Sequence, residues 1–159
     1  CSFAMLALLL TSFLVNKSTY NFYDVFFCNN TSTYCYIYSE EDFKENLTAF
    51  NSNKQLINCV KNGSKWFVNF NNKTVLQNIK PPQYKQVTGN FSPTTLQKAL
   101  KKVKAKLVKV ENYNNIKILF FYTPVWQDYR QIENYKINLQ IAINSSSTTI
   151  GYPMIYGSF

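Results

Sequence analysis

The chain has 159 residues, of which 46% are hydrophobic, and it carries a formal net charge of +9 without a single histidine. A chain of this length buries one ordinary core, so we expect one folded domain. Without imidazole groups the chain has no histidine general base, no Ser-His-Asp or Cys-His catalytic set and no histidine metal ligand. Its 4 glycines form no phosphate-binding GxxxxGKS/T or GxGxxG motif. These absences exclude most hydrolases and nucleotide-binding enzymes, and we expect a protein that is not an enzyme and uses no cofactor and no metal.

Residues 1–15, CSFAMLALLLTSFLV, are almost wholly apolar and predict a hydrophobic anchor. As a helix rising about 1.5 Å per residue, this run spans roughly 22 Å, short of the roughly 30 Å hydrocarbon layer of a bilayer. A complete transmembrane helix would therefore need residues before Cys1, and we expect the run to be the end of such a helix. Two alternatives remain open, a signal-peptide core and a buried helix of a soluble domain. In the first interpretation residues 1–15 contact membrane lipid and residues 16–159 form the folded domain.

Between the anchor and residue 80 the sequence predicts short strands, turns and helices. Aromatic and β-branched residues dominate four expected strands, which we place at 20–28, 34–38, 65–70 and 74–79. Ser39 is expected to cap a helix that begins with three acidic residues and ends near Asn51. A second short helix is expected at 54–61, ended by a left-handed turn at Gly63. The first two strands should pair with each other, and the last two should form a hairpin.

A helix is predicted from Ser92 to Val110. Ser92 can cap its first turn, and Pro93 occupies the first helical position, where a missing N–H costs nothing. Apolar residues recur at helical spacing along one side, at Leu96, Ala99, Leu100, Val103, Leu107 and Val110. Lysines cover most of the remainder, and four of them form a candidate face for an anionic partner, namely Lys98, Lys101, Lys102 and Lys104. The alternative interpretation of these lysines is a solvated helix surface.

Three more strands are expected after this helix. They lie at 116–122, an apolar run expected to be a central strand, at 136–143, where apolar and polar residues alternate, and at 148–156. Strands and helices are mixed without a regular β-α-β rhythm, which favours the α+β class over a doubly wound sheet. We therefore predict an N-terminal anchor followed by one small mixed or antiparallel sheet with two or three helices.

The cysteines allow one expected disulfide. Cys28 and Cys35 would pair if the strands that carry them form a hairpin in an oxidising compartment. In a reducing compartment the thiols are simply small core residues. A zinc site uses four ligands, so Cys28, Cys35 and Cys59 without histidine leave such a site incomplete.

Asn-x-Ser/Thr sequons, the acceptor motif of N-glycosylation, occur at Asn16, Asn29, Asn30, Asn46, Asn62, Asn72, Asn90 and Asn144. This number is more than twice what the content of Asn, Ser and Thr gives by chance. Four sequons in predicted loops or turns, where a bulky sugar is sterically acceptable, are the candidate glycosylation sites: Asn29, Asn30, Asn62 and Asn72. The alternative is an Asn- and Ser-rich sequence that carries no glycan.

These observations favour a non-catalytic, membrane-anchored, extracytoplasmic or lumenal glycoprotein domain with a structural or binding role in a membrane or envelope assembly. Its expected place is the secretory pathway or a cell or virion surface, and its expected partners are membrane lipid and other proteins. The alternative is a basic structural subunit of a nucleic-acid-containing particle, such as an organellar ribosome, in which the lysines of the predicted helix contact phosphates. The chain's single arginine, Arg130, weakens this alternative, because arginine is the residue that most often reads and clamps nucleic acid.

Overall fold

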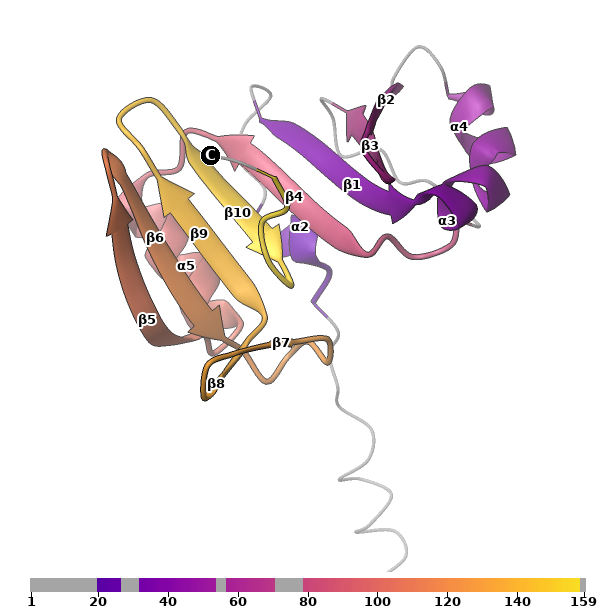
Figure 1. Ribbon diagram of the computed structural model, residues 1–159. Helices are drawn as coiled ribbons and strands as arrows, with labels where there is room; N and C mark the ends of the chain where they lie inside the picture. The colour runs from indigo at the N-terminus through magenta and orange to yellow at the C-terminus, as the bar shows by residue number, and fades with distance from the viewer. Residues whose placement is uncertain (1–19, 27–31, 54–56, 71–78, 158–159) are drawn as a thin grey trace, which may run out of the picture.

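The computed structural model describes residues 20–26, 32–53, 57–70 and 79–157 (Figure 1). The predicted anchor at 1–15 lies outside these residues. Within the described ranges, no helix combines the length and hydrophobicity that crossing a bilayer requires. The molecule is a mixed α+β structure, as predicted from the sequence, but its antiparallel sheet is large rather than small.

One sheet of eight strands contains most of the described strands, and every neighbouring pair in it is antiparallel. From one edge to the other the strands are β2 (Ile57–Asn62), β3 (Lys65–Phe70), β1 (Thr33–Ser39), β4 (Tyr84–Gly89), β10 (Thr148–Tyr152), β9 (Leu139–Ile143), β6 (Ile116–Tyr122) and β5 (Lys106–Tyr113). A separate hairpin consists of β7 (Arg130–Ile132) and β8 (Tyr135–Ile137). The strands of the two halves of the chain meet where β4 pairs with β10.

Two helices, α2 (Phe22–Val25) and α5 (Pro93–Lys102), pack on one face of the sheet. Figure 1 shows both behind the sheet. The core between them and the strands consists of apolar and aromatic side chains, among them Phe22, Tyr23, Phe26, Tyr34, Phe70, Val87, Leu96, Ala99, Val103, Phe121, Trp126, Leu139, Ile141 and Ile150. The strand residues of this set lie opposite one another in neighbouring strands, as Tyr34 lies opposite Val87 and Val87 opposite Ile150, so they point to the same face.

A second core lies under α3 (Glu40–Glu45) and α4 (Leu47–Ser52), at the β1–β3 end of the sheet. The ring of Phe43 stacks on Trp66, with 4.0 Å between centroids and 2° between planes. Ser39 caps α3 as predicted, because its hydroxyl accepts a hydrogen bond from the Asp42 amide at 3.2 Å. The predicted helix from Ser39 to Asn51 is therefore present, but it is divided at Asn46 into two short helices.

The opposite face of the sheet is crossed by the segment that follows β10, drawn in front of the sheet in Figure 1. The ring of Tyr156 packs on Phe67 and Tyr84, with centroids 5.9 and 5.1 Å away. Gly151 allows this return, since a Cβ there would lie 2.5 Å from the Ile155 nitrogen. The predicted strand 148–156 therefore ends at Tyr152, where the chain turns back over its own sheet.

The predicted helix from Ser92 is confirmed at its start, but the prediction placed its end too far along the chain. It ends at Lys102, where the Lys104 and Ala105 amides donate to the Lys101 and Leu100 carbonyls in a Schellman arrangement. Lys104 adopts a left-handed conformation, with φ of 52°, and the chain then turns into β5. Leu96, Ala99 and Val103 are buried as expected, and Leu100 packs against the same core. The remaining two members of the predicted stripe, Leu107 and Val110, are instead 55% and 42% exposed on β5.

Two other elements differ from the sequence prediction. Residues 57–61 belong to strand β2 and not to a helix, because the left-handed Gly63, with φ of 59°, closes a hairpin between β2 and β3. The expected strand at 20–28 contains the short helix α2 over its described part, and the Asn21 side chain caps it by accepting from the Tyr23 amide at 3.1 Å. Burial of Phe22 and Tyr23 under the sheet outweighs the β-propensity of these aromatic residues.

Of the other predicted strands, those within the described residues are present, with some changes in position. Residues 34–38 and 65–70 form β1 and β3, which pair with each other, whereas residues 71–78 of the expected hairpin lie outside the described residues. The apolar run 116–122 is β6, which lies next to the edge strand β5 rather than at the centre. The run 136–143 is divided at Asn138 between β8 and β9.

Candidate functional site

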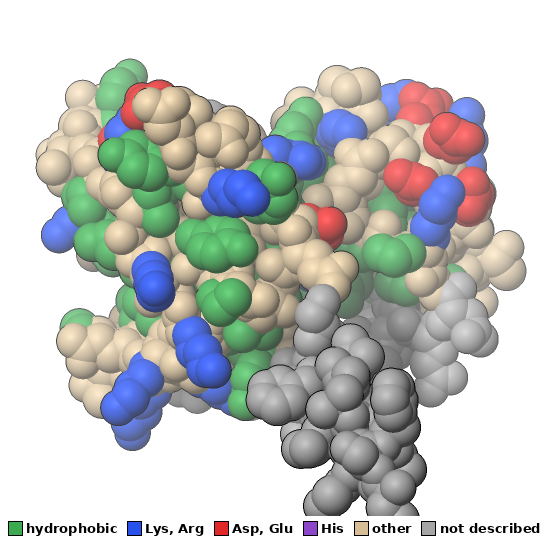
Figure 2. Space-filling model, turned by 90° about the horizontal axis from the view of Figure 1, so that it is seen from below, with side chains coloured by type: hydrophobic (Ala, Val, Ile, Leu, Met, Phe, Trp, Pro, Cys, Tyr) green, Lys and Arg blue, Asp and Glu red, His purple; other side chains and the backbone are tan. Residues whose placement is uncertain are grey.

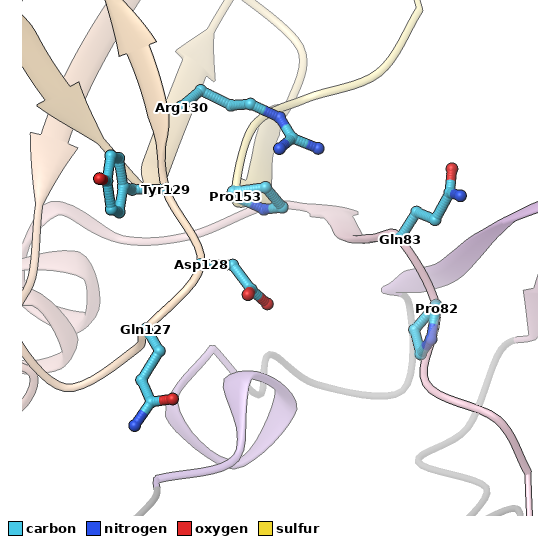
Figure 3. Close-up of a pocket in the computed structure, with 7 residues that line it drawn as sticks. All are labelled: Pro82, Gln83, Gln127, Asp128, Tyr129, Arg130 and Pro153. Atoms are coloured by element: carbon cyan, nitrogen blue, oxygen red, sulfur yellow. The ribbon is translucent and has the colours of Figure 1, made fainter.

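An open cleft of about 530 Å³ lies between the loop after β6 and the connection that precedes β4. It is lined by Pro82, Gln83, Gln127, Asp128, Tyr129, Arg130 and Pro153. Figure 3 shows the side chains of Asp128 and Arg130 pointing into the gap toward Pro82 and Gln83, whereas the ring of Tyr129 points away from it. The lining is mainly polar and presents one carboxylate and one guanidinium.

Asp128 is held in place by Tyr152, which comes from strand β10. The Tyr152 hydroxyl donates to the Asp128 carboxylate at 3.1 Å and accepts from the Asp128 amide at 3.3 Å. Burial, and then the nearby Asp128 carboxylate, raise the pKa of Tyr152 well above its ordinary value of 10.0, so this hydroxyl stays a donor. The carboxylate therefore has a fixed direction relative to the sheet.

Arg130 is oriented by Tyr84 of strand β4. Its guanidinium lies over the Tyr84 ring, 5.5 Å from the centroid, and donates to the Tyr84 hydroxyl at 3.4 Å. Lys85 follows Tyr84 on β4 and so points to the other face of the sheet, where its ammonium lies 6.0 Å from the centroid of Tyr152. Burial lowers the pKa of Lys85, and the Asp128 carboxylate opposes this effect. Tyrosines of two neighbouring strands, Tyr84 of β4 and Tyr152 of β10, therefore each hold one charged residue of the cleft.

The loop that carries the cleft residues is fixed from beneath by Asn138, which is fully buried between β8 and β9. Its side-chain oxygen accepts from the Thr123 amide at 2.8 Å, and its side-chain nitrogen donates to the Thr123 carbonyl at 2.8 Å and to the Trp126 carbonyl at 3.0 Å. Trp126 in turn donates from its indole nitrogen to the Tyr20 carbonyl at 2.7 Å. The segment before Gln127 is thus rigid, which positions Asp128 and Arg130.

The Asp128 carboxylate and the Arg130 guanidinium give this cleft groups that can form hydrogen bonds with a ligand and pair with its charges. Elsewhere in the described part of the chain, no three Cys, Asp or Glu side chains come together in a group that could hold a metal ion. Arginine and tyrosine are the residues that most often contribute strongly to protein–protein binding, and both lie at this cleft.

The lysine face predicted from the sequence is present on α5 and at its end. Lys98, Lys101, Lys102 and Lys104 are all exposed. None of the four forms an ion pair with a carboxylate of the described residues. The Lys102 ammonium lies 4.9 Å from the centroid of the Tyr20 ring, a cation–π contact.

The described sequons divide into one buried and three exposed asparagines. Asn46 is only 3% exposed, and its side chain donates to the Asp42 carbonyl at 3.0 Å and accepts from the Lys80 amide at 2.7 Å, a structural role. Asn62, Asn90 and Asn144 are exposed at or beside turns. Of the four candidate glycosylation sites, the structure describes only Asn62, because Asn29, Asn30 and Asn72 lie outside the described residues.

The expected disulfide is not tested, because Cys28 lies outside the described residues. Its expected partner Cys35 is a free, buried thiol on β1. Burial raises the pKa of Cys35 to about 12, which leaves it an unreactive thiol at neutral pH. Cys59 is also free and lies on β2, where it packs against the core under α3 and α4.

Sequence reasoning did not find the cleft. The stretch 126–135 reads as polar and ambiguous, and Pro82 and Gln83 read as a connection, so nothing in either segment indicates that they face each other. One available signal was Arg130, the only arginine of a strongly basic chain, because a guanidinium placed among lysines indicates planar contacts that lysine cannot make.

Comparison of the chain with protein-family models, with curated proteins and with solved structures finds no match.

Proposed function

We propose that this chain is a non-catalytic extracytoplasmic domain that is anchored in a membrane by residues 1–15 and holds a protein partner in a membrane or envelope assembly. The apolar N-terminal run, the density of sequons and the lack of histidine support this proposal. The cleft between Asp128 and Arg130 on one side and Gln83 on the other is the proposed contact surface. It offers a positively charged donor, a negatively charged acceptor and neutral amide groups to an extended polar segment of the partner.

The observation that carries the proposal is the placement of the sequons. Three of the described acceptor asparagines are exposed, and Asn62 is the last residue of β2, directly before the two-residue turn of Gly63 and Ser64 that joins β2 and β3. A glycan on such a turn extends into solvent without displacing core residues. None of these three asparagines lines the cleft around Asp128, so sugars on them leave that surface open.

Glycosylation mapping in a eukaryotic secretory pathway tests the proposal. We expect the chain, directed there by a cleavable signal, to lose mass on endoglycosidase treatment, and Asn62→Gln to remove one step of that loss. Asn58→Gln, which changes an exposed asparagine of the same hairpin outside any sequon, is the matched control and should change nothing. A chain that reaches the lumen and carries no sugar on Asn62, Asn90 or Asn144 would contradict the lumenal assignment.

A second candidate function is favoured by the unpaired lysines of α5. A basic subunit of a nucleic-acid-containing particle would use Lys98, Lys101, Lys102 and Lys104 on phosphates. On duplex DNA the logarithm of the affinity would then fall with the logarithm of salt concentration with a slope of about −0.9 per phosphate contact. Binding that is weak at physiological salt and does not depend on these lysines would exclude this function.

A further inference from the structure

We propose that the lysine face of α5, defined as Lys98, Lys101, Lys102 and Lys104, lies on the anionic head groups of the same membrane that holds residues 1–15. This inference rests on the proposed function, because the apolar run, once embedded in lipid, holds the lysine face beside the leaflet on the domain's own side of the membrane, which must then contain acidic lipid. It adds a second, electrostatic contact that fixes how the domain lies on the bilayer. Three features of the described residues carry it.

The first feature is the one-sided charge of α5. Leu96, Ala99 and Val103 face the sheet and are buried, which leaves the lysines on the solvent side. The helix and the two residues that follow it contain no acidic residue. The C-terminal end of a helix carries partial negative charge, so the terminal lysines are also stabilised where they are. The face is therefore a local excess of positive charge that no carboxylate of the described residues pairs with.

The second feature is the contrast with Lys44, Lys61 and Lys80. At the α3 end of the molecule Lys44 and Lys61 contact Glu40 at 3.3 and 2.9 Å, and Lys80 contacts Asp42 at 2.9 Å. These lysines are neutralised by their neighbours. Figure 2 shows both arrangements, with lysines that lack acidic neighbours at the lower left and mixed acidic and basic side chains at the right. The protein therefore has a distinct cationic end and does not spread its charge evenly.

The third feature is the covalent tether. Tyr20 is the first described residue after the apolar run, and it contacts the lysine face directly through the Lys102 ammonium 4.9 Å from its ring. Its carbonyl is fixed by the Trp126 indole. Four residues separate Val15 from Tyr20, and the five Cα-to-Cα steps of a fully extended chain between them reach at most about 18 Å. A membrane that holds the apolar run is therefore within reach of this end of α5.

A lipid surface suits these lysines better than a nucleic acid does. Head-group phosphates and carboxylates form a diffuse anionic layer, which compact ammonium groups on flexible stems meet without a fixed geometry. The positive charge does not oppose translocation, because long domains cross largely regardless of their charge. Basic residues near an anionic surface strengthen binding by about fivefold each, so three lysines should contribute on the order of 100-fold at moderate salt.

Lysine acetylation of the full chain on vesicles tests the inference without depending on the affinity of the anchor. We expect vesicles that contain phosphatidylserine to protect Lys98, Lys101 and Lys104 from acetylation, and vesicles of phosphatidylcholine alone to protect them less. Lys44 and Lys61, at the neutralised end, serve as internal controls and should react equally on both. Adding salt should remove the difference.

A matched pair of triple variants of the full chain completes the test by vesicle titration. The first variant combines Lys98→Gln, Lys101→Gln and Lys102→Gln and should lose the preference for phosphatidylserine. The control lowers the net charge by the same amount at the other end of the molecule, with Lys44→Gln, Lys61→Gln and Lys80→Gln, and should retain that preference. Wild-type protein that binds both vesicle types equally would overturn this inference and would not affect the proposed anchor. Equal loss in both triple variants, or a loss confined to duplex DNA, would also overturn it.

Failure of the proposed function gives a different result. Protein that does not bind phosphatidylcholine vesicles would contradict the proposed anchor. If the same protein keeps a lysine-dependent affinity for phosphatidylserine, the lysine face of α5 still binds lipid. Protein that binds neither vesicle type would overturn both. The two proposals are thus separated by the lipid composition and by the position of the substituted lysines.

Discussion

Replacing Asn138 by alanine should destabilise the protein more than any surface substitution, because this side chain holds the loop beneath the cleft. The substitution removes three buried hydrogen bonds, two to the Thr123 backbone and one to the Trp126 carbonyl. Each such bond contributes about 1 kcal/mol, and each backbone group left unpaired in the interior costs about 1 to 3 kcal/mol. We therefore expect a loss of about 3 to 5 kcal/mol in the free energy of unfolding.

Urea denaturation followed by tryptophan fluorescence measures this loss, and Trp126 lies beside the affected loop. For a protein of this size the melting temperature should fall by roughly 10 °C. Asn58→Ala is the control, since Asn58 is exposed on the edge strand β2 and its removal should change stability by less than about 0.5 kcal/mol.

Asn138→Asp separates hydrogen bonding from the loss of volume. The aspartate has the shape of asparagine but places an oxygen against the carbonyls of Thr123 and Trp126, so its carboxyl must keep a proton to restore one of the two lost donated hydrogen bonds. Its pKa in the folded protein would then lie above the ordinary value of about 3.9, and the stability of this variant should rise as the pH falls through that raised pKa. If Asn138→Ala cost under about 1 kcal/mol, or if Asn138→Asp behaved as wild type at pH 7, the described network would be wrong.

Two further predictions test the end of α5 and the sheet thiol. Val103→Ala should lower the free energy of unfolding by about 2 kcal/mol because Val103 is fully buried, whereas Leu107→Ala, at a residue 55% exposed, should lower it by under about 0.5 kcal/mol in the same urea titration. Equal losses would instead support the helix predicted to extend to Val110. Burial raises the pKa of Cys35 to about 12 from an ordinary value of 9.0, so the unfolded chain loses this proton first and the free energy of unfolding should fall as the pH rises from about 9 to about 12. Cys35→Ala should make that fall shallower, and a parallel fall in the two proteins would contradict the buried thiol.

The ends of the elements show what the sequence could predict. The start of α5 was predictable because Ser92 and Pro93 act locally, and the structure shows the Ser92 hydroxyl accepting from the Thr95 amide at 3.1 Å. Its end was not, because the left-handed residue is Lys104 and not a glycine, and lysine gives no signal for that conformation. The helical spacing happens to continue through Leu107 and Val110, so the periodicity extends past the real boundary.

Gly63 illustrates an ambiguity of another kind. A glycine with positive φ ends a helix or closes a hairpin equally well, and its own sequence context permits both. The choice is made by residues that follow, since β3 pairs on both sides, with β2 and with β1. Strand order is likewise a long-range property, which is why β6 was expected at the centre and lies beside the edge.

The cleft was beyond local reasoning for the same reason, because its lining comes from three segments far apart in the chain. The same contacts that build it also link it to the start of the described chain. Asn138 fixes Trp126 through its carbonyl, and Trp126 fixes Tyr20 through its indole nitrogen. Asp128 follows Trp126 by two residues, and Tyr20 follows the apolar run by five. If residues 1–15 are held in a membrane, a partner at the cleft would therefore lie within a limited distance of it, since the chain from Val15 to Tyr20 spans at most about 18 Å.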